Sequence, residues 1–389
     1  MNNVKLKRFI SIYTGNSISD GEKDNFTVQN EKTIPYISTK DIDSNTNKVD
    51  YFNDMYIDVT KNTKFKIANK GDILLCVEGG SAGKKIAKLD YDVCFVNKLC
   101  CFKCNEKFDN EFLYYYLQSD LFLSQFYLNM TGLIGGVSQT AIKEFKLPYL
   151  SKAKQIIIAK YLSKKIKKID ENIEKNKKII DLLEEYKISF VSNIIKQEKC
   201  EYGRLKKYMY EINEKNNDED AQLLSVFTKI GVDLRENMED RGNKASTVMN
   251  YKIVKKDDMI VNKLLAWMGA FGVSSYNGVT SPDYDVFRFR DGSLPQFYHY
   301  YFRYTNFKNE CYKNGHGIML MRWRTYSSEL LNIEVPHPSF QRQNELTEIF
   351  KRKFILIEKS INKRQQLIIK LEEYKKSLIY EAITGKIEV

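Results

Sequence analysis

Histidine is scarce in this sequence, which restricts the chemistry that the chain can perform by itself. The three histidines, His299, His316 and His337, all lie in the second half, so no histidine triad or histidine metal site is common to both halves. A Walker loop is also absent, which argues against ATP hydrolysis. Neither the pattern G-x-G-x-x-G nor an Asn-Pro-Pro-aromatic tetrad occurs, so the usual sequence support for a methyl-transfer site is missing.

Long apolar runs are absent as well. No stretch of about 18 apolar residues occurs, and the first ten residues alternate basic with apolar side chains, so we expect a cytoplasmic protein without a membrane span. The seven cysteines are an odd number and are expected to be reduced. A zinc site at Cys101 and Cys104 with the nearby Cys94 and Cys100 is one interpretation, but the strand-like pattern of residues 93–103 favours buried strand cysteines.

Basic and aromatic residues, by contrast, are plentiful. The 389 residues include 62 Lys and Arg against 50 Asp and Glu, a net charge of +12, together with 26 Tyr and 22 Phe. A chain of this length and apolar content can form hydrophobic cores in two or three domains. The positive charge favours a polyanionic partner, either nucleic acid or an anionic membrane surface.

The chain contains a long internal repeat. Residues 183–187 recur as residues 371–375, an offset of 188, and the same offset pairs Gln155 with Gln343 within an ungapped alignment of some fifty residues. A looser match continues upstream at residues 71–74, with an offset of 186. We therefore predict two copies of one module, each a globule followed by a helical segment.

Each helical segment carries a heptad pattern. Its apolar positions recur at alternating steps of four and three residues, from Leu162 in the first copy and from Phe350 in the second, as in the a/d seam of a coiled coil. Asn176 and Arg364 interrupt the seams at equivalent positions, where a polar group fixes the register. A proline stop and a serine N-cap precede each helix. We expect the two helices to pack antiparallel; the alternative is that each only covers its own globule.

Four segments follow from the repeat. They are two globules over residues 1–148 and 201–336, and two helical regions over residues 149–200 and 337–389. The helical regions carry net charges of +6 and +4, and each globule carries only +1. Most of the helix lysines are expected on a solvated face, so any DNA-reading face on a globule must be locally asymmetric in charge.

The globules mix strand-like and helix-like patterns. Short β-rich runs, such as residues 72–77, 93–103 and 259–263, alternate with helix-like stretches, such as residues 110–128 and 294–304, and with glycine-bearing loops. This pattern predicts a mixed α/β (α+β) fold with a strongly curved sheet in each globule.

Two further motifs have a suggestive composition. Glu185 and Lys187, repeated as Glu373 and Lys375, have the spacing of some nuclease sites, but they lie on the predicted coiled coil, where a scaffold role is preferred. Residues 78–85 resemble a phosphate cradle, because glycines let backbone N–H groups approach an anion and lysines supply charge. The loop lacks the Walker spacing, so a DNA phosphate is preferred over a nucleotide.

Two globules, each followed by a proline stop, a glutamine and a long heptad helix, resemble the specificity (S) subunit of Type I restriction-modification systems over the whole chain. The resemblance is most specific at residues 262–274 and 278–287, and residues 381–386 are also typical of the family. The first copy departs from this pattern, since Leu150 stands where the second copy has Pro338 and a glycine-rich loop replaces the Trp-Met-Gly-Ala-Phe-Gly block.

The resemblance implies a non-catalytic DNA-recognition subunit with no cofactor and no metal of its own. Each globule would read one half of a split, asymmetric site in double-stranded DNA. The helices would set the spacer between the half-sites and dock two methyltransferase subunits. Those partners would carry S-adenosylmethionine and methylate adenine, and a separate restriction motor subunit would supply the ATP- and Mg-dependent cleavage.

Base contacts are expected from polar, basic and aromatic residues in the glycine-bearing loops. The candidates are Ser81, Lys84, Lys85, Ser138 and Gln139 in the first globule, and Lys263, Trp267, Arg322 and Arg324 in the second. Arginine can bridge guanine O6 and N7, and glutamine can bridge adenine N6 and N7. The alternative is that Trp267 belongs to the core and that many of the others contact phosphate or solvent.

Two rival functions follow from other features of the sequence. One is a coiled-coil scaffold for protein interactions without sequence-specific DNA binding. The other is a nuclease that uses carboxylates such as Asp283 and Asp285. Sequence-specific retention of DNA together with a matching methyltransferase would separate the recognition function from both.

Overall fold

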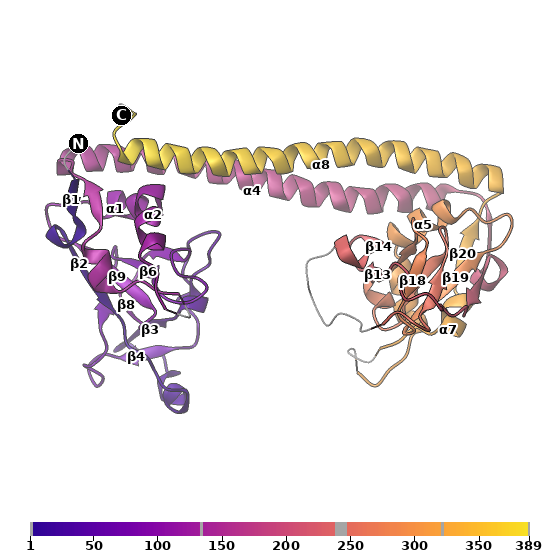
Figure 1. Ribbon diagram of the computed structural model, residues 1–389, viewed down its shortest axis with the longest axis horizontal. Coiled ribbons are helices and arrows are strands. Elements are labelled where there is room, and N and C mark those ends of the chain that lie inside the picture. Colours follow the sequence, from indigo (N-terminus) through magenta and orange to yellow (C-terminus); the bar gives the residue numbers. More distant parts are fainter. Residues whose placement is uncertain (1–2, 133–134, 238–246, 320–322, 388–389) are drawn as a thin grey trace. The chain divides into compact units, whose positions relative to one another are not determined.

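The computed structural model describes residues 3–132, 135–237, 247–319 and 323–387 (Figure 1). The chain forms two compact units, Met1–Lys175 with Leu367–Val389, and Asn176–Gln366. Each unit contains one globular lobe and one part of each of two long helices. Lobe 1 extends from strand β1 to strand β10, and lobe 2 extends from β11 to β20.

Lobe 1 combines small sheets with short helices. Its strands are β1 (Asn3–Lys5), β2 (Ile10–Thr14), β3 (Thr33–Ile37), β4 (Tyr56–Asp58), β5 (Ile67–Ala68), β6 (Ile73–Cys76), β7 (Ile86–Lys88), β8 (Val93–Phe95), β9 (Leu99–Cys104) and β10 (Lys146–Pro148). Its α-helices are α1 (Asn110–Gln118), α2 (Asp120–Leu128) and α3 (Gln139–Lys143). The main sheet has the order β2-β9-β6-β7, a second sheet has the order β4-β3-β8-β5, and β1 pairs with β10.

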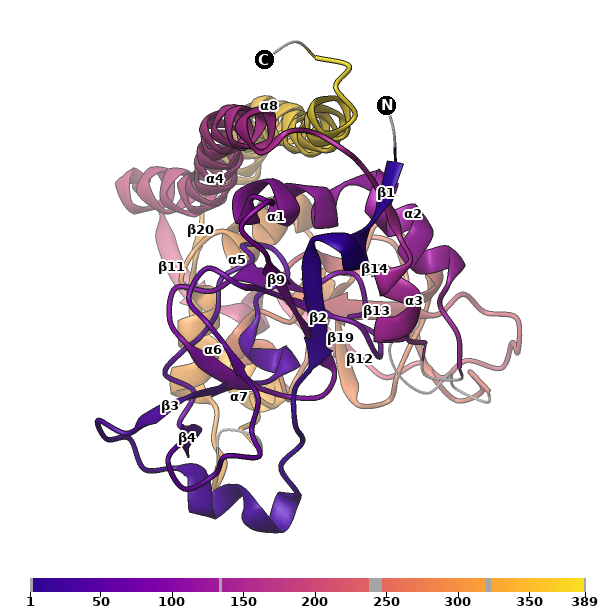
Figure 2. The same ribbon diagram turned by 90° about the vertical axis from the view of Figure 1, so that its left-hand side faces the viewer.

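Both faces of the main sheet of lobe 1 are buried. On β6, Ile73 and Leu75 face a core that includes α1, α2 and the long helices, whereas Leu74 and Cys76 face a second core that includes β8. Figure 2 shows α1 beside the long helix α4, with the sheet beyond it. Since successive strand residues point to opposite faces, burial of both faces explains why these strands are continuous apolar runs.

Three details of lobe 1 differ from the sequence-based expectation. The stretch 110–128 forms two helices, because Ser119 ends α1 and its hydroxyl caps the amide of Phe122 at the start of α2. The run 93–103 forms two strands, β8 and β9, which belong to different sheets. The predicted strongly curved sheet is instead a set of small, separate sheets.

Lobe 2 repeats this plan. Its strands are β11 (Glu201–Arg204), β12 (Met209–Ile212), β13 (Leu224–Phe227), β14 (Gly231–Leu234), β15 (Lys252–Val254), β16 (Met259–Asn262), β17 (Phe271–Val273), β18 (Gly278–Thr280), β19 (Tyr284–Phe289) and β20 (Glu334–His337). Its α-helices are α5 (Pro295–Arg303), α6 (Phe307–Asn314) and α7 (Ser327–Asn332). The main sheet has the order β12-β19-β16-β17. These strands correspond to β2, β9, β6 and β7 of lobe 1, so the two main sheets have the same strand order.

The strand register confirms the repeat inside the lobes. Ile73 of β6 pairs with Phe102 of β9, and Met259 of β16 pairs with Phe287 of β19. Ile73 and Met259 are separated by the offset of 186 that the sequence predicts. The two lobes are therefore copies of one α+β module.

The two long helices are α4 (Lys152–Gln197) and α8 (Phe340–Ile383), which pack antiparallel (Figure 1). Each begins after its predicted N-cap: the hydroxyl of Ser151 accepts from the amide of Lys154, and that of Ser339 accepts from the amide of Arg342. All of the predicted seam positions are buried or half-buried. The predicted coiled coil is therefore confirmed.

Polar contacts in the coiled coil repeat with the sequence. The guanidinium of Arg364 donates to Asn176 Oδ1 at 3.0 Å, so the two predicted polar interruptions contact each other. Lys375 forms an ion pair with Asp170 at 2.7 Å, and Lys187, which stands 188 residues before Lys375, forms one with Glu358. Glu358 is likewise the repeat equivalent of Asp170. The same ion pair therefore occurs twice, which supports a scaffold role for Lys187 and Lys375.

The repeated glutamines attach each long helix to its lobe. Gln155 Oε1 accepts from the amide of Asp109 at 2.9 Å, and its amide group donates to the carbonyl of Leu150 at 2.8 Å. Gln343 makes the equivalent bonds, with Leu294 at 2.7 Å and with Pro338 at 2.8 Å. Asp109 and Leu294 are the N-cap residues of α1 and α5. The first helix of each lobe is thus fixed to the first turns of a long helix.

The cysteine-rich stretch of lobe 1 forms buried strands. Cys94 lies in β8, and Cys100, Cys101 and Cys104 lie in β9, all with free thiols. Burial raises the pKa of Cys94, Cys100 and Cys104 to about 12. These thiols are therefore protonated core groups. Across the described ranges, no helix has both the length and the apolar character that a membrane span needs.

Candidate nucleic-acid interface

The two groups of candidate residues in lobe 1 lie on adjacent loops. The loop between β6 and β7, residues 77–85, carries Ser81, Lys84 and Lys85, and the segment 129–139 ends in Ser138 and Gln139. The loops are joined by backbone hydrogen bonds, from the amide of Gly79 to the carbonyl of Gly135 at 2.8 Å and from the amide of Val137 to the carbonyl of Val77 at 3.0 Å. The structure thus brings the candidates of lobe 1 together.

The individual roles of these candidates differ. Lys84 is exposed at the turn of its loop. The ammonium group of Lys85 donates to the carbonyl of Thr39 at 2.7 Å, which directs this side chain toward its own lobe. The hydroxyl of Ser138 caps α3 by accepting from the amide of Ala141 at 3.2 Å. Ser81 and Gln139 are half-buried. Lys84 is therefore the candidate of lobe 1 with the most accessible charge.

Lobe 2 brings its candidates together in the equivalent loops. The loop between β16 and β17, residues 263–270, carries Lys263 and Trp267, and the loop before α7 carries Arg324. The amide of Thr325 donates to the carbonyl of Lys263 at 3.0 Å, which joins the two loops. The exposed Arg324 lies next to this bond. Arg322 lies outside the described residues.

Trp267 supports its loop from inside. Its indole N–H donates to the carbonyl of Leu264 at 3.1 Å, and the half-buried ring lies 6.2 Å from that of Tyr312. Tyr312 in turn stacks on Trp323 of the other loop, with ring centres 5.0 Å apart. This aromatic row joins the two candidate loops of lobe 2 through α6.

Lys263 lies beside a buried carboxylate. Asp285 Oδ1 is 3.2 Å from the ammonium nitrogen of Lys252 and 3.8 Å from that of Lys263. Burial raises the pKa of Asp285, although both lysines oppose this effect. Asp285 therefore neutralises lysines at the base of the loop, and Asp283 is exposed on a separate turn. In residues 3–132, 135–237, 247–319 and 323–387, no three His, Cys, Asp or Glu side chains are grouped so that they could hold a metal ion.

Arg303 is a residue that the sequence analysis missed. It is the last residue of α5, and its guanidinium donates to the carbonyls of Thr228 at 3.0 Å, Gly269 at 2.9 Å and Phe271 at 3.3 Å, and also to that of Lys229. Burial lowers the pKa of Arg303. The side chain fastens the turn between β13 and β14 to the loop that carries Trp267. A single arginine at a helix end gives no sequence signal for such a bridge.

Comparison with known proteins agrees with the family that the sequence resembles. Residues 1–185, which include lobe 1 and most of α4, match the model of the Type I restriction modification DNA specificity domain. This part of the chain therefore carries a DNA specificity domain of the Type I kind.

The fold of the whole chain has full-length counterparts among solved structures. One is a chain from a study of complex assembly and conformational transition of the type I R-M system, with a TM-score of 0.73, 14% identity, and coverage of 99% of this chain and 98% of that one. Another is the HsdS subunit from Thermoanaerobacter tengcongensis, with a TM-score of 0.55, 14% identity, and coverage of 99% and 97%. The two-lobe, two-helix fold is therefore shared over almost the whole chain.

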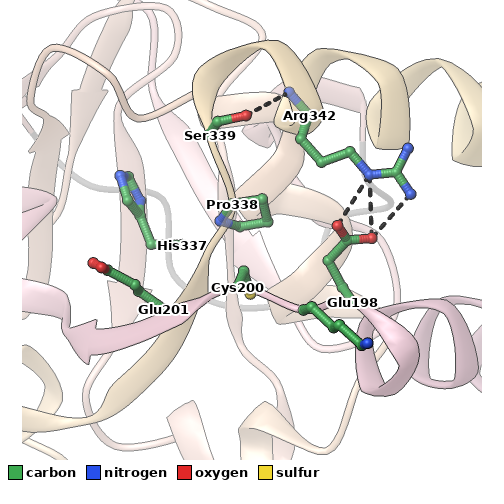
Figure 3. A pocket seen from close by; sticks show the side chains of 8 residues that line it. Glu198, Cys200, Glu201, His337, Pro338, Ser339 and Arg342 are labelled. Carbon is green, nitrogen blue, oxygen red and sulfur yellow. Dashed lines mark hydrogen bonds and ion pairs between the residues drawn. The ribbon is translucent and has the colours of Figure 1, made fainter.

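A groove lies where lobe 2 meets the long helices (Figure 3). There Arg342 of α8 forms a two-pronged ion pair with Glu198 after α4, with Nη2 and Oε2 2.9 Å apart. The ring of His337 stacks on Tyr208, with centres 3.9 Å apart, and its Nδ1 lies 2.8 Å from the hydroxyl of Tyr298. These polar groups are engaged in holding the joint, so the groove is a structural junction.

Proposed function

We propose that this chain is a DNA specificity subunit that reads DNA without catalysing a reaction, with each lobe contacting one half of a bipartite, asymmetric site. The observation that carries the proposal is that equivalent loops on one sheet frame differ in chemistry. The loop between β6 and β7 of lobe 1 exposes Gly80 and Lys84, whereas the candidate loops of lobe 2 expose Met268 and Arg324. Two similar frames with different contact groups suit two different half-sites.

The long helices are proposed to dock two methyltransferase subunits. Tyr186 on α4 and Tyr374 on α8 are repeat equivalents, and their exposed fractions are 41% and 52%. The ion pairs of Lys187 and Lys375 stand beside them in equivalent positions. A surface that occurs twice on one chain fits two copies of the same partner. Adenine methylation with S-adenosylmethionine, and cleavage with ATP and Mg by a motor subunit, would then belong to the partners.

The helices are also proposed to set the distance between the half-sites. Helix α4 has 46 residues, which corresponds to about 69 Å at 1.5 Å per residue. Because the coiled-coil contacts are distributed along α4 and α8, helix length rather than one side chain would fix the spacer.

Exchange of one lobe tests the bipartite reading. Residues 201–335 are replaced by the equivalent lobe of a relative, the chimera is expressed with its methyltransferase, and the methylated motif is sequenced. We expect one half of the motif to change while the other half and the spacer persist. A change in both halves would contradict independent reading, and sequence-independent methylation would favour a protein scaffold.

A paired insertion tests the spacer. Four residues are inserted after Asn176 and four after Arg364, so that both helices gain about one turn, or roughly 6 Å. A coiled coil can absorb such a stutter by local unwinding. We expect the unspecific spacer to lengthen by about one or two base pairs with both half-sites unchanged, since a base-pair step is about 3.4 Å. The same insertion into the exposed turn after Ser44 serves as the control and should leave the spacer unchanged.

The purified chain without partners tests the assignment of catalysis. We expect no methyl transfer, nuclease or ATPase activity when it is incubated with S-adenosylmethionine, ATP, Mg and target DNA. Methyl transfer by the partner-free chain would contradict the proposal.

A further inference from the structure

Three loops of lobe 2 meet at one surface. They are the turn between β13 and β14 (residues 228–230), the loop 263–270, and the described residues 315–319 and 323–325 of the loop before α7. Arg303 bonds the first loop to the second through their carbonyls. The backbone bond from Thr325 joins the third loop to the second. We call this surface, made of the three loops, the lobe 2 tip.

The lobe 2 tip concentrates exposed apolar side chains. Within the described part of lobe 2, every exposed large aliphatic or methionine side chain belongs to it. These side chains, with their exposed fractions, are Ile230 (52%), Leu265 (38%), Met268 (48%), Ile318 (94%) and Met319 (56%). Single exposed apolar residues need no explanation, but a concentration in adjoining loops indicates a contact surface.

The charge of the same loops indicates what the surface contacts. The described residues of these loops include no aspartate or glutamate, and their exposed basic residues are Lys229 and Arg324. An apolar surface with exposed cations complements a polyanion with apolar groups inside its grooves. Duplex DNA fits this description, because thymine presents a methyl group in the major groove.

We propose that the lobe 2 tip contacts thymine methyl groups, so that the half-site read by lobe 2 contains A·T pairs. This inference rests on the proposed function and names the bases that one lobe selects. In lobe 1, the loop between β6 and β7, equivalent to 263–270, exposes only Gly80 and Lys84. That loop exposes no large apolar group that could contact a thymine methyl, so we place this contact in lobe 2.

Replacement of thymine by uracil tests the contact, because uracil lacks only the methyl group. The full chain with its methyltransferase is titrated with duplexes that carry the methylated motif, with uracil in place of thymine in the lobe 2 half-site. We expect the dissociation constant to rise about fourfold for each contacted methyl, the ratio that corresponds to about 0.8 kcal/mol. Uracil in the unspecific spacer should leave the dissociation constant unchanged.

A paired variant locates the effect in the tip. Ile318→Ser with Met319→Ser removes two exposed apolar side chains without opening a core, and we expect the thymine-to-uracil ratio to fall to about one. Val28→Ser in lobe 1 is the matched control, because Val28 is also exposed (67%) and lies outside these loops. The control should keep the full ratio.

The outcomes separate this inference from the proposed function. Specific methylation with no thymine in the lobe 2 half-site, or with equal affinity for thymine and uracil, would overturn the inference alone. Failure of the complex to methylate any specific motif would overturn the proposed function. A variant that loses the methyltransferase in gel filtration but keeps its thymine-to-uracil ratio would assign the tip to a protein contact, which also overturns the inference.

Discussion

The two lobes of the chain agree in their frames and differ in their loops. Both have the same strand order in the main sheet, and both bind a repeated glutamine of a long helix at the N-cap of their first helix. Asp72 and Asp258 also make the same turn bond, each to the amide three residues earlier. The candidate loops differ in their exposed side chains: the loop between β6 and β7 in lobe 1 exposes Lys84, and the candidate loops of lobe 2 expose Met268 and Arg324. Duplication has therefore kept the interactions that hold the module together, while the exposed loops have diverged.

The joints between helix and lobe also differ. In the second unit, Arg342 forms an ion pair with Glu198. The repeat equivalents of these residues in the first unit are Lys154 and Lys386, which have the same sign of charge. Lys386 lies over the ring of Tyr380 instead, with its ammonium nitrogen 4.9 Å from the ring centre. The ion pair of Arg342 and Glu198 in the joint of lobe 2 thus has no counterpart between Lys154 and Lys386 in the joint of lobe 1.

Replacement of the glutamines that join each long helix to its lobe should have the largest effect on stability. Gln343→Ala leaves the amide of Leu294 and the carbonyls of Pro338 and Gly292 without a partner, so lobe 2 should lose about 3–5 kcal/mol of stability. Gln155→Ala breaks two bonds and should cost lobe 1 about 1 kcal/mol less.

Hydrogen exchange of the Leu294 and Asp109 amides measures the two glutamine effects separately, because a two-lobed chain need not unfold in one step. Gln341→Ala, an exposed neighbour on α8, is the matched control and should change little. Equal losses for the two joint variants would show that the third bond of Gln343 is not stabilising.

Acidification should weaken lobe 2 more than lobe 1 through its histidines, since lobe 1 has none. Burial, with a smaller contribution from Arg303, lowers the pKa of His299 to about 4, and burial also lowers the pKa of His337. The unfolded chain takes up these protons below about pH 6.5, so the stabilising contribution is complete above that pH. It is lost as the pH falls toward 4, by up to about 3 kcal/mol for His299.

Urea unfolding of lobe 2 between pH 7 and pH 4, followed by hydrogen exchange, measures this effect. His299→Gln should flatten the pH dependence of lobe 2 and leave lobe 1 unchanged. An unaltered slope in the variant would show that His299 is not protected from protonation in the folded lobe.

Loss of loop cations should affect one half-site at a time. Arg324→Ala should cost about 1–3 kcal/mol of binding on the second half-site if the guanidinium bridges guanine, and Arg322→Ala is expected to act likewise. Lys84→Ala should weaken only contacts with the first half-site. Binding to duplexes altered in one half-site, measured at several salt concentrations, tests this. Uniform weakening with a shallower salt dependence would assign these residues to phosphate.

The sequence predicts the repeated parts of this molecule well, because they follow local periodicity. The heptad seam, the antiparallel helices and the strand cysteines all follow from spacing and composition. The break at Ser119 was missed, because the hydroxyl caps one helix directly at the end of another within an apolar run. The bridge of Arg303 was missed for another reason, since its four carbonyl partners come from two distant loops. Contacts of that kind depend on tertiary structure and leave no local pattern.

The smallest expected effect distinguishes a helix cap from a base contact at Ser138. The hydroxyl caps α3 in lobe 1, whereas Tyr326, which precedes α7 in lobe 2, makes no such bond. Ser138→Ala should therefore cost about 1 kcal/mol in α3, measured by hydrogen exchange of the Ala141 amide, and should leave the methylated motif unchanged. Ser138→Asp keeps a capping oxygen and should keep that stability, while its charge should weaken binding if α3 faces phosphate. If Ser138→Ala instead relaxes the preference for one base of the first half-site and leaves the stability of α3 unchanged, the Ser138 hydroxyl contacts DNA and does not stabilise the helix.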